Sequence, residues 1–206
     1  MNAVTDAGET KSGTERLVGF TDGVIAVAIT LLVLDVRLPD LPEHADSAAL
    51  AAALLSLVPK LSAYGLSFLV VGAFWYIHHL RFRHIHRCDA PLIWLNLLFL
   101  LVIGIVPFAS SVLSEHPNAV GHALYDGVMA VAALLSALLW GYAIQGNRLV
   151  SPSLDAAARR QSLVAPLLVA GVFVLSGLIA WFDVRAARWA WWLLIPAVLL
   201  PPGRGR

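Results

Sequence analysis

Residues 16–38 form an apolar run long enough to cross a lipid bilayer as a helix, and this run constrains the fold more than any other feature of the chain. Its first turns contain one acidic residue, Asp22. A carboxylate at that depth costs a few kcal/mol unless a polar group on another helix accompanies it. The position of Asp22 therefore indicates a functional or inter-helix role.

Further apolar runs follow, and the composition agrees with them. Hydrophobic residues make up 59% of the chain, charged residues 13%, and the mean hydropathy is +0.79. Soluble domains contain about a quarter charged residues, so this chain has too few charges to cover a water-exposed surface. We predict an all-α, polytopic membrane protein with six transmembrane helices, at residues 16–37, 55–82, 90–113, 119–146, 162–182 and 187–201. A polar loop is expected at 39–50.

The basic residues predict the orientation of these spans. We expect a disordered cytoplasmic tail at 1–15, a membrane domain at 16–201 and a basic C-terminal tail at 202–206. With both termini in the cytoplasm, ten lysines and arginines lie on the inner side and only Arg37, Lys60, Arg185 and Arg188 lie outside. This asymmetry follows the positive-inside rule. The inner residues are Lys11, Arg16, Arg81, Arg83, Arg87, Arg148, Arg159, Arg160, Arg204 and Arg206.

Several classes of function receive no support from the sequence. The net charge is +1, and no basic segment interleaved with aromatic residues favours nucleic-acid binding. Enzyme motifs such as a nucleophile elbow or a phosphate-binding glycine loop are absent, and no cofactor is expected. The histidine-rich run at 78–88 lacks a carboxylate or a second cysteine at metal-site spacing, so we expect no metal. We interpret it as a basic loop that meets anionic lipid headgroups.

Four polar residues on three predicted helices fall at a similar depth in the membrane. Asp22 lies near the inner end of the first span, His78 and His79 near the inner end of the second, and Asn96 on the third. Buried polar groups in lipid need such partners. The cluster is either an inter-helix clasp or part of a proton or ion path. Asp126 lies in a short repeat of the sequence around Asp22 and is a second candidate proton site.

A stripe of side chains follows one face of the first helix. Val27, Thr30, Leu31 and Leu34 recur at the i, i+3, i+4, i+7 spacing. Alone, such a stripe is most often a packing seam. Around a symmetry axis it would instead form stacked rings, in which apolar side chains gate by dewetting and threonine hydroxyls replace part of an ion's hydration shell.

The segment Arg16-Leu-Val-Gly-Phe20-Thr21-Asp22 resembles the Arg-x-x-x-Phe-Ser-Asp signature of the transmembrane protein 175 family, which are potassium channels of lysosomes and bacteria. The resemblance extends over about residues 16–110 and includes the segments 74–79 and 94–99. Thr21 replaces the serine of the signature and keeps its hydroxyl group.

This resemblance implies a homotetramer in which the first helix of each subunit lines a central pore. By position, the constriction would fall at Val27 and the threonine layer at Thr30, with further apolar rings at Leu31 and Leu34. The residues expected to hold the first helix in place are Arg16, Phe20, Thr21, Asp22, His78, His79, Trp94 and Asn96. The implied function is a potassium-preferring cation channel that lies in the plasma membrane of a bacterium. Two alternatives stay open: a proton-permeable or proton-coupled pathway, and a non-conducting membrane scaffold.

Overall fold

The computed structural model describes residues 2–150 and 155–195, and its elements are all helices. Within these ranges the one β-type pairing is an isolated antiparallel bridge between Ile85 and Val150. The predicted all-α class is therefore confirmed. The elements are α1 (Asn2–Leu31), η1 (Leu32–Asp35), α2 (Ser47–Ser56), α3 (Val58–Phe82), α4 (Ala90–Glu115), α5 (Ala119–Ile144), η2 (Gln145–Asn147), α6 (Ala156–Ala180), α7 (Val184–Ala190) and η3 (Trp191–Leu193), where η marks a 3₁₀ helix.

Five segments of the described chain are long and apolar enough to cross a membrane: Gly13–Asp35, Val58–Phe82, Ala90–Glu115, Ala119–Asn147 and Ser162–Ala180. They match the first five predicted spans. The described part of the sixth predicted span, 187–201, consists of the end of α7 and the short η3. Residues 196–201 and the predicted basic tail at 202–206 lie outside the described residues.

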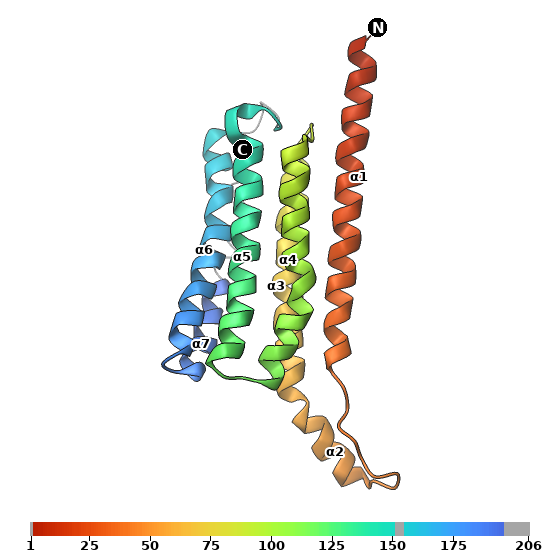
Figure 1. The fold of residues 1–206 in the computed structure, drawn as a ribbon, viewed down its shortest axis with the longest axis vertical. Coiled ribbons are helices and arrows are strands. Elements are labelled where there is room, and N and C mark those ends of the chain that lie inside the picture. The colour runs from red at the N-terminus through yellow and green to blue at the C-terminus, as the bar shows by residue number, and fades with distance from the viewer. Residues whose placement is uncertain (1, 151–154, 196–206) are drawn as a thin grey trace.

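The long helices form a bundle in which α1 lies at one edge (Figure 1). α5 packs most extensively against α6 and α4, whereas α1 packs against α3 and α4. The central core contains fully buried side chains such as Ile103, Val106, Met129 and Phe173. Within a single chain, the described part of α1 therefore buries one face against α3 and α4, and its other side packs against no other helix.

Two boundaries differ from the sequence prediction. α1 begins at Asn2, so the segment 2–15 that we predicted to be a disordered tail continues the first helix. Once a helix is nucleated, each added residue gains a hydrogen bond at little further cost, which favours this extension. The predicted polar loop at 39–50 is shorter, because Asp46 accepts a hydrogen bond from the backbone N–H of Ala49 at 2.7 Å and caps α2. In Figure 1, α2 projects away from the bundle.

A buried arginine near the end of α3 ties that helix to α5 and α6. Arg81 is only 5% exposed, although the sequence assigned it to an inner loop. Its guanidinium donates to the hydroxyl and the carbonyl of Ser136, both at 3.0 Å, and to the carbonyl of Ser162. It also lies over the ring of Trp140, 5.6 Å from the centroid. These contacts let a long basic side chain remain inside the bundle without a carboxylate partner.

Candidate functional site

The predicted stripe on the first helix faces away from the rest of the chain. The buried side chains along the described part of α1 and the start of η1 follow the spacing of one helix face: Thr14, Leu17, Thr21, Ile25, Ala28 and Leu32. On the other side, the exposed fractions are 57% for Val27, 44% for Leu31 and 58% for Leu34, and Thr30 is also exposed. The stripe is therefore not a packing seam within one chain.

Thr30 is oriented so that its hydroxyl oxygen can meet a cation. Its hydroxyl group donates a hydrogen bond to the carbonyl of Val27 at 2.8 Å. Because the proton points to the backbone, the lone pairs of the oxygen face outward from the helix. Such an oxygen can replace part of an ion's hydration shell when several copies meet.

The helix changes its winding at the outer end of the stripe. From Leu32 to Asp35 the backbone forms a 3₁₀ turn instead of an α-helix. In a 3₁₀ helix the residues i and i+3 are eclipsed, so Leu34 lies almost directly in line with Leu31 along the helix axis. The two leucines thus form one continuous apolar edge, which the α-helical spacing used in the sequence analysis did not predict.

A chain of buried hydrogen bonds holds the inner half of α1 against α3 and α4. Asn96 of α4 donates to the hydroxyl of Thr21 at 2.8 Å, and its carbonyl oxygen pairs with Nε2 of His78 on α3 at 2.9 Å. Because that oxygen can only accept, His78 carries its proton on Nε2. Thr21 in turn donates to the carbonyl of Leu17 at 2.9 Å. All three linked side chains are at most 4% exposed.

Asp22 lies beside this chain but uses a different partner from the one expected. Its carboxylate accepts a hydrogen bond from the indole N–H of Trp75 at 2.8 Å, and His79 stacks on the same indole at 5.7 Å between ring centroids. The sequence analysis gave Trp75 no role in this cluster. The other expected clasp residues do not join the cluster within one chain: Phe20 is 54% exposed, Trp94 is 67% exposed, and Arg16 is exposed as well.

A second attachment, which the sequence analysis missed, holds the outer end of the stripe. The two carboxylate oxygens of Asp35 accept hydrogen bonds from the hydroxyl groups of Ser111 at 2.6 Å and Ser114 at 2.7 Å, both on α4. The signal in the sequence is the i, i+3 pair of serines near the end of the third span. With this contact, α4 holds α1 on both sides of Val27 and Thr30.

The titratable group Cys88, outside the spans, borders α1 where its membrane-length segment begins. The thiol of Cys88 lies 3.3 Å from the hydroxyl of Thr14. Burial raises the pKa of Cys88, because a thiolate is poorly solvated there.

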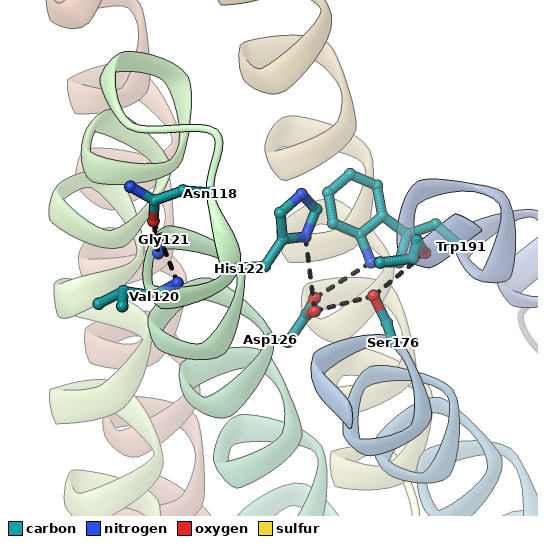
Figure 2. A network of polar contacts seen from close by, with 8 residues as sticks. Asn118, Val120, Gly121, His122, Asp126, Ser176 and Trp191 are labelled. Atoms are coloured by element: carbon teal, nitrogen blue, oxygen red, sulfur yellow. Dashed lines mark hydrogen bonds and ion pairs between the residues drawn. The ribbon is translucent and has the colours of Figure 1, made fainter. Parts of the chain in front are cut away.

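Asp126 belongs to a separate buried cluster that involves α5, α6 and η3 (Figure 2). Its carboxylate accepts hydrogen bonds from Ser176 on α6 at 2.8 Å and from the indole N–H of Trp191 on η3 at 3.0 Å. Nδ1 of His122 lies 3.7 Å from the same carboxylate. Asp126 is 1% exposed, and its hydrogen-bond partners come from α6 and η3, not from α1. The cluster joins η3 and α6 to α5.

The start of α5, next to this cluster, is fixed by a cap and a close backbone contact. Asn118 accepts hydrogen bonds from the N–H groups of Val120 and Gly121, both at 3.0 Å (Figure 2). A Cβ atom on Gly121 would lie 2.1 Å from the carbonyl oxygen of His116, so only glycine fits. This turn positions His122 and Asp126 on the first turns of α5.

We expect that replacing Asp126 with alanine lowers the free energy of unfolding by about 1–3 kcal/mol, because the buried N–H of Trp191 loses its acceptor. Asp126→Asn should have a much smaller effect, since the amide oxygen can still accept from Trp191 and its NH₂ can donate to Ser176. Thermal unfolding in detergent measures both variants. Equal losses would show that the charge of Asp126, not its hydrogen bonds, holds the cluster.

Together, the fold and the site define an α-helical, multi-span membrane protein whose first helix presents an apolar stripe interrupted by one hydroxyl group. The family model described as "Endosomal/lysosomal potassium channel TMEM175" matches residues 16–107. A potassium channel of Streptomyces collinus is 38% identical over 173 residues, which cover 77% of this chain and 82% of that protein. The chain belongs to the TMEM175 family.

Other relatives agree with this membership. A potassium channel of Chamaesiphon minutus is 34% identical over 84% of this chain and 89% of its own length. The crystal structure of a lysosomal potassium-selective channel TMEM175 homolog from the same organism superposes with a TM-score of 0.75 at 28% identity, and covers 91% of this chain and 96% of that one. The endosomal/lysosomal proton channel TMEM175 of Bos taurus is 40% identical over 100 residues, which are 46% of this chain and 21% of that protein.

Proposed function

We propose that this protein is a potassium-preferring cation channel of the bacterial cell membrane, formed by four copies whose first helices surround a central pore. The observation that carries the proposal is the stripe of Val27, Thr30, Leu31 and Leu34, which no other part of the described chain covers. The potassium channels among its relatives support the same function. Arg16, Phe20 and Trp94, which are exposed in one chain, then belong to contacts between subunits.

In such a tetramer the stripe produces a narrow pathway that combines two kinds of ring. Rings of Val27, Leu31 and Leu34 exclude water at the narrow points, so an ion must lose part of its hydration shell to pass. The ring of Thr30 hydroxyls supplies oxygen atoms where this loss occurs. Potassium loses its hydration water more easily than sodium does, which gives a preference without a carbonyl-lined filter.

Replacing Thr30 with valine tests the role of the hydroxyl group. Valine keeps the shape of threonine and removes the oxygen, so we expect the potassium-over-sodium permeability ratio to fall severalfold. Reversal potentials in planar bilayers with potassium on one side and sodium on the other measure this ratio.

Thr30→Ser is the matched control, because it keeps the hydroxyl group and should retain most of the preference. Unchanged reversal potentials in Thr30→Val would show that the hydroxyl group of Thr30 does not produce the potassium preference. A protein that elutes as a monomer in detergent would contradict the shared pore itself.

A proton-permeable pathway is the second candidate, and the mammalian relatives described as proton channels favour it. It would use Asp22, which lies beside the exposed side of α1, or the pair of His122 and Asp126. Proton conduction predicts liposome flux that follows a pH gradient and is lost in Asp22→Asn while the oligomer stays intact. The potassium proposal instead predicts that Asp22→Asn keeps its potassium flux, because the amide oxygen can still accept from Trp75, and that Asp22→Ala disturbs assembly, because the indole N–H loses its acceptor.

A further inference from the structure

A groove of about 790 Å³ lies between the inner half of α1 and the end of α3. Its size falls within the range of roughly 300–1,000 Å³ that is usual for ligand sites. The floor is apolar and consists of Val18, Phe82 and Ile85. The groove therefore offers an apolar base under the charged groups described next.

The groove opens on a different side of α1 from the proposed pore. Glu15, Val18, Gly19 and Asp22 line it at the i, i+3, i+4, i+7 spacing. This set precedes the stripe at 27–34 by twelve residues, which corresponds to a rotation of about 120° around an α-helix. A molecule in the groove would contact the pore-lining helix without entering the pore.

The charges that line the groove are divided between two walls. Glu15 and Asp22 come from α1, whereas Arg83 and Arg87 come from the end of α3 and the loop that follows it. The two arginines are exposed, and within the described chain their guanidinium groups form no hydrogen bond or ion pair. The two arginines and the two carboxylates balance each other, and the imidazoles of His79 and His86 also line the groove, so it has a dipole and little fixed net charge.

These walls lie where lipid headgroups are found, because α3 is a membrane-length helix that ends at Phe82, one residue before Arg83. Guanidinium groups bind phosphate through paired, charge-assisted hydrogen bonds. A primary ammonium group offers three donors to carboxylates, whereas the quaternary ammonium of choline offers none. A purely anionic headgroup would bring no positive charge to the two carboxylates of α1, and Asp22 would keep only its hydrogen bond from Trp75.

We propose that the groove binds the headgroup of phosphatidylethanolamine, with its phosphate at Arg83 and Arg87 and its ammonium group at Glu15 and Asp22. The first acyl carbons lie on the floor formed by Val18 and Phe82. The bound lipid connects the inner end of α1 to the end of α3.

Native mass spectrometry of the full-length protein in detergent tests this proposal. Phosphatidylethanolamine, phosphatidylcholine and phosphatidylglycerol are added separately, and the lipid retained per subunit is measured. We expect phosphatidylethanolamine to bind roughly tenfold more tightly than phosphatidylcholine, which corresponds to about 1.4 kcal/mol. Inorganic phosphate, added in excess, should not displace it.

Variants of each wall separate the two halves of the headgroup. The double variant Arg83→Gln/Arg87→Gln should no longer retain phosphatidylethanolamine. Glu15→Gln should retain only as much phosphatidylethanolamine as the wild type retains of phosphatidylglycerol. The matched control is Arg185→Gln/Arg188→Gln, which removes the same charge from two exposed arginines of α7 and should bind as the wild type does.

A further variant fills the groove without changing a charge. No atom lies within 4 Å of a Cβ built on Gly19, so Gly19→Leu can extend into the groove and should also abolish retention. It keeps the proposal testable if the arginine variant does not fold.

Equal retention of the ethanolamine and choline lipids by the wild type would overturn the proposal. Retention that survives in both Arg83→Gln/Arg87→Gln and Gly19→Leu, or displacement by inorganic phosphate, would also overturn it. Because the measurement counts bound lipid and not ion flux, a negative result leaves the proposed channel function standing.

Discussion

Replacing Leu34 with asparagine is expected to raise potassium flux into liposomes tenfold or more. In the proposed tetramer this change places four amides in a ring that is otherwise apolar, so water fills the constriction and the barrier to ions falls. A decrease of about 1.4 kcal/mol in that barrier is enough for a tenfold rise. Val27→Asn should act in the same direction, and the larger of the two increases identifies the narrower ring.

The control for these variants is the same substitution on an exposed leucine elsewhere in the bundle. Leu138 on α5 is 54% exposed, which is close to the 58% of Leu34, and it lies outside the stripe. Leu138→Asn should leave the flux near that of the wild type. If it raises flux as much as Leu34→Asn, the increase reflects a leaky bundle, and if neither stripe variant changes flux, the stripe is not the gate.

Replacing Asn96 with leucine should lower the free energy of unfolding by about 2–5 kcal/mol. Leucine has the same number of side-chain heavy atoms and the same branch at Cγ as asparagine, but it is bulkier and forms no hydrogen bond. Nε2 of His78 loses its only acceptor and the hydroxyl oxygen of Thr21 loses its donor, and each buried group left unpaired costs about 1–3 kcal/mol. Thermal unfolding in detergent, read by the loss of the monodisperse oligomer, measures the effect.

The matched control for Asn96→Leu is Thr21→Ser, which keeps the hydroxyl group and removes one methyl group. We expect a loss of about 1 kcal/mol or less from it. A similar loss in both variants would show that packing, and not the hydrogen-bonded chain, holds α1 in place.

The sequence predicted those parts of the fold that depend on local composition. Apolar runs gave the first five spans to within a few residues, because a bilayer fixes the length of a crossing helix. Depth along the helices brought Asp22, His78, His79 and Asn96 to one level, and in the structure His78 and Asn96 share a hydrogen bond while Asn96 also donates to Thr21, the neighbour of Asp22 in the chain. A rise of 1.5 Å per residue was enough for this inference.

Other features depend on three-dimensional contacts that periodicity does not encode. Whether Arg81 reaches water or the carbonyls of α5 and α6 depends on the rotation of α3, so the sequence placed it in a loop. The contact of Asp35 with Ser111 and Ser114 joins residues far apart in the chain. Phe20 and Trp94 were assigned to a clasp within one chain, yet both are exposed, which is the expected position for residues that contact another subunit.

The 3₁₀ turn at Leu32–Asp35 winds the end of the first helix more tightly than the α-helix that precedes it. Each residue turns about 120° in this geometry and about 100° in an α-helix. Rewinding the three steps from Leu31 to Leu34 would swing Leu34 by about 60° around the axis while residues 2–31 stay still. In the proposed tetramer, four such leucines turning together would change the width of the pore at this level, and the hydrogen bonds of Asp35 to α4 would oppose the rotation.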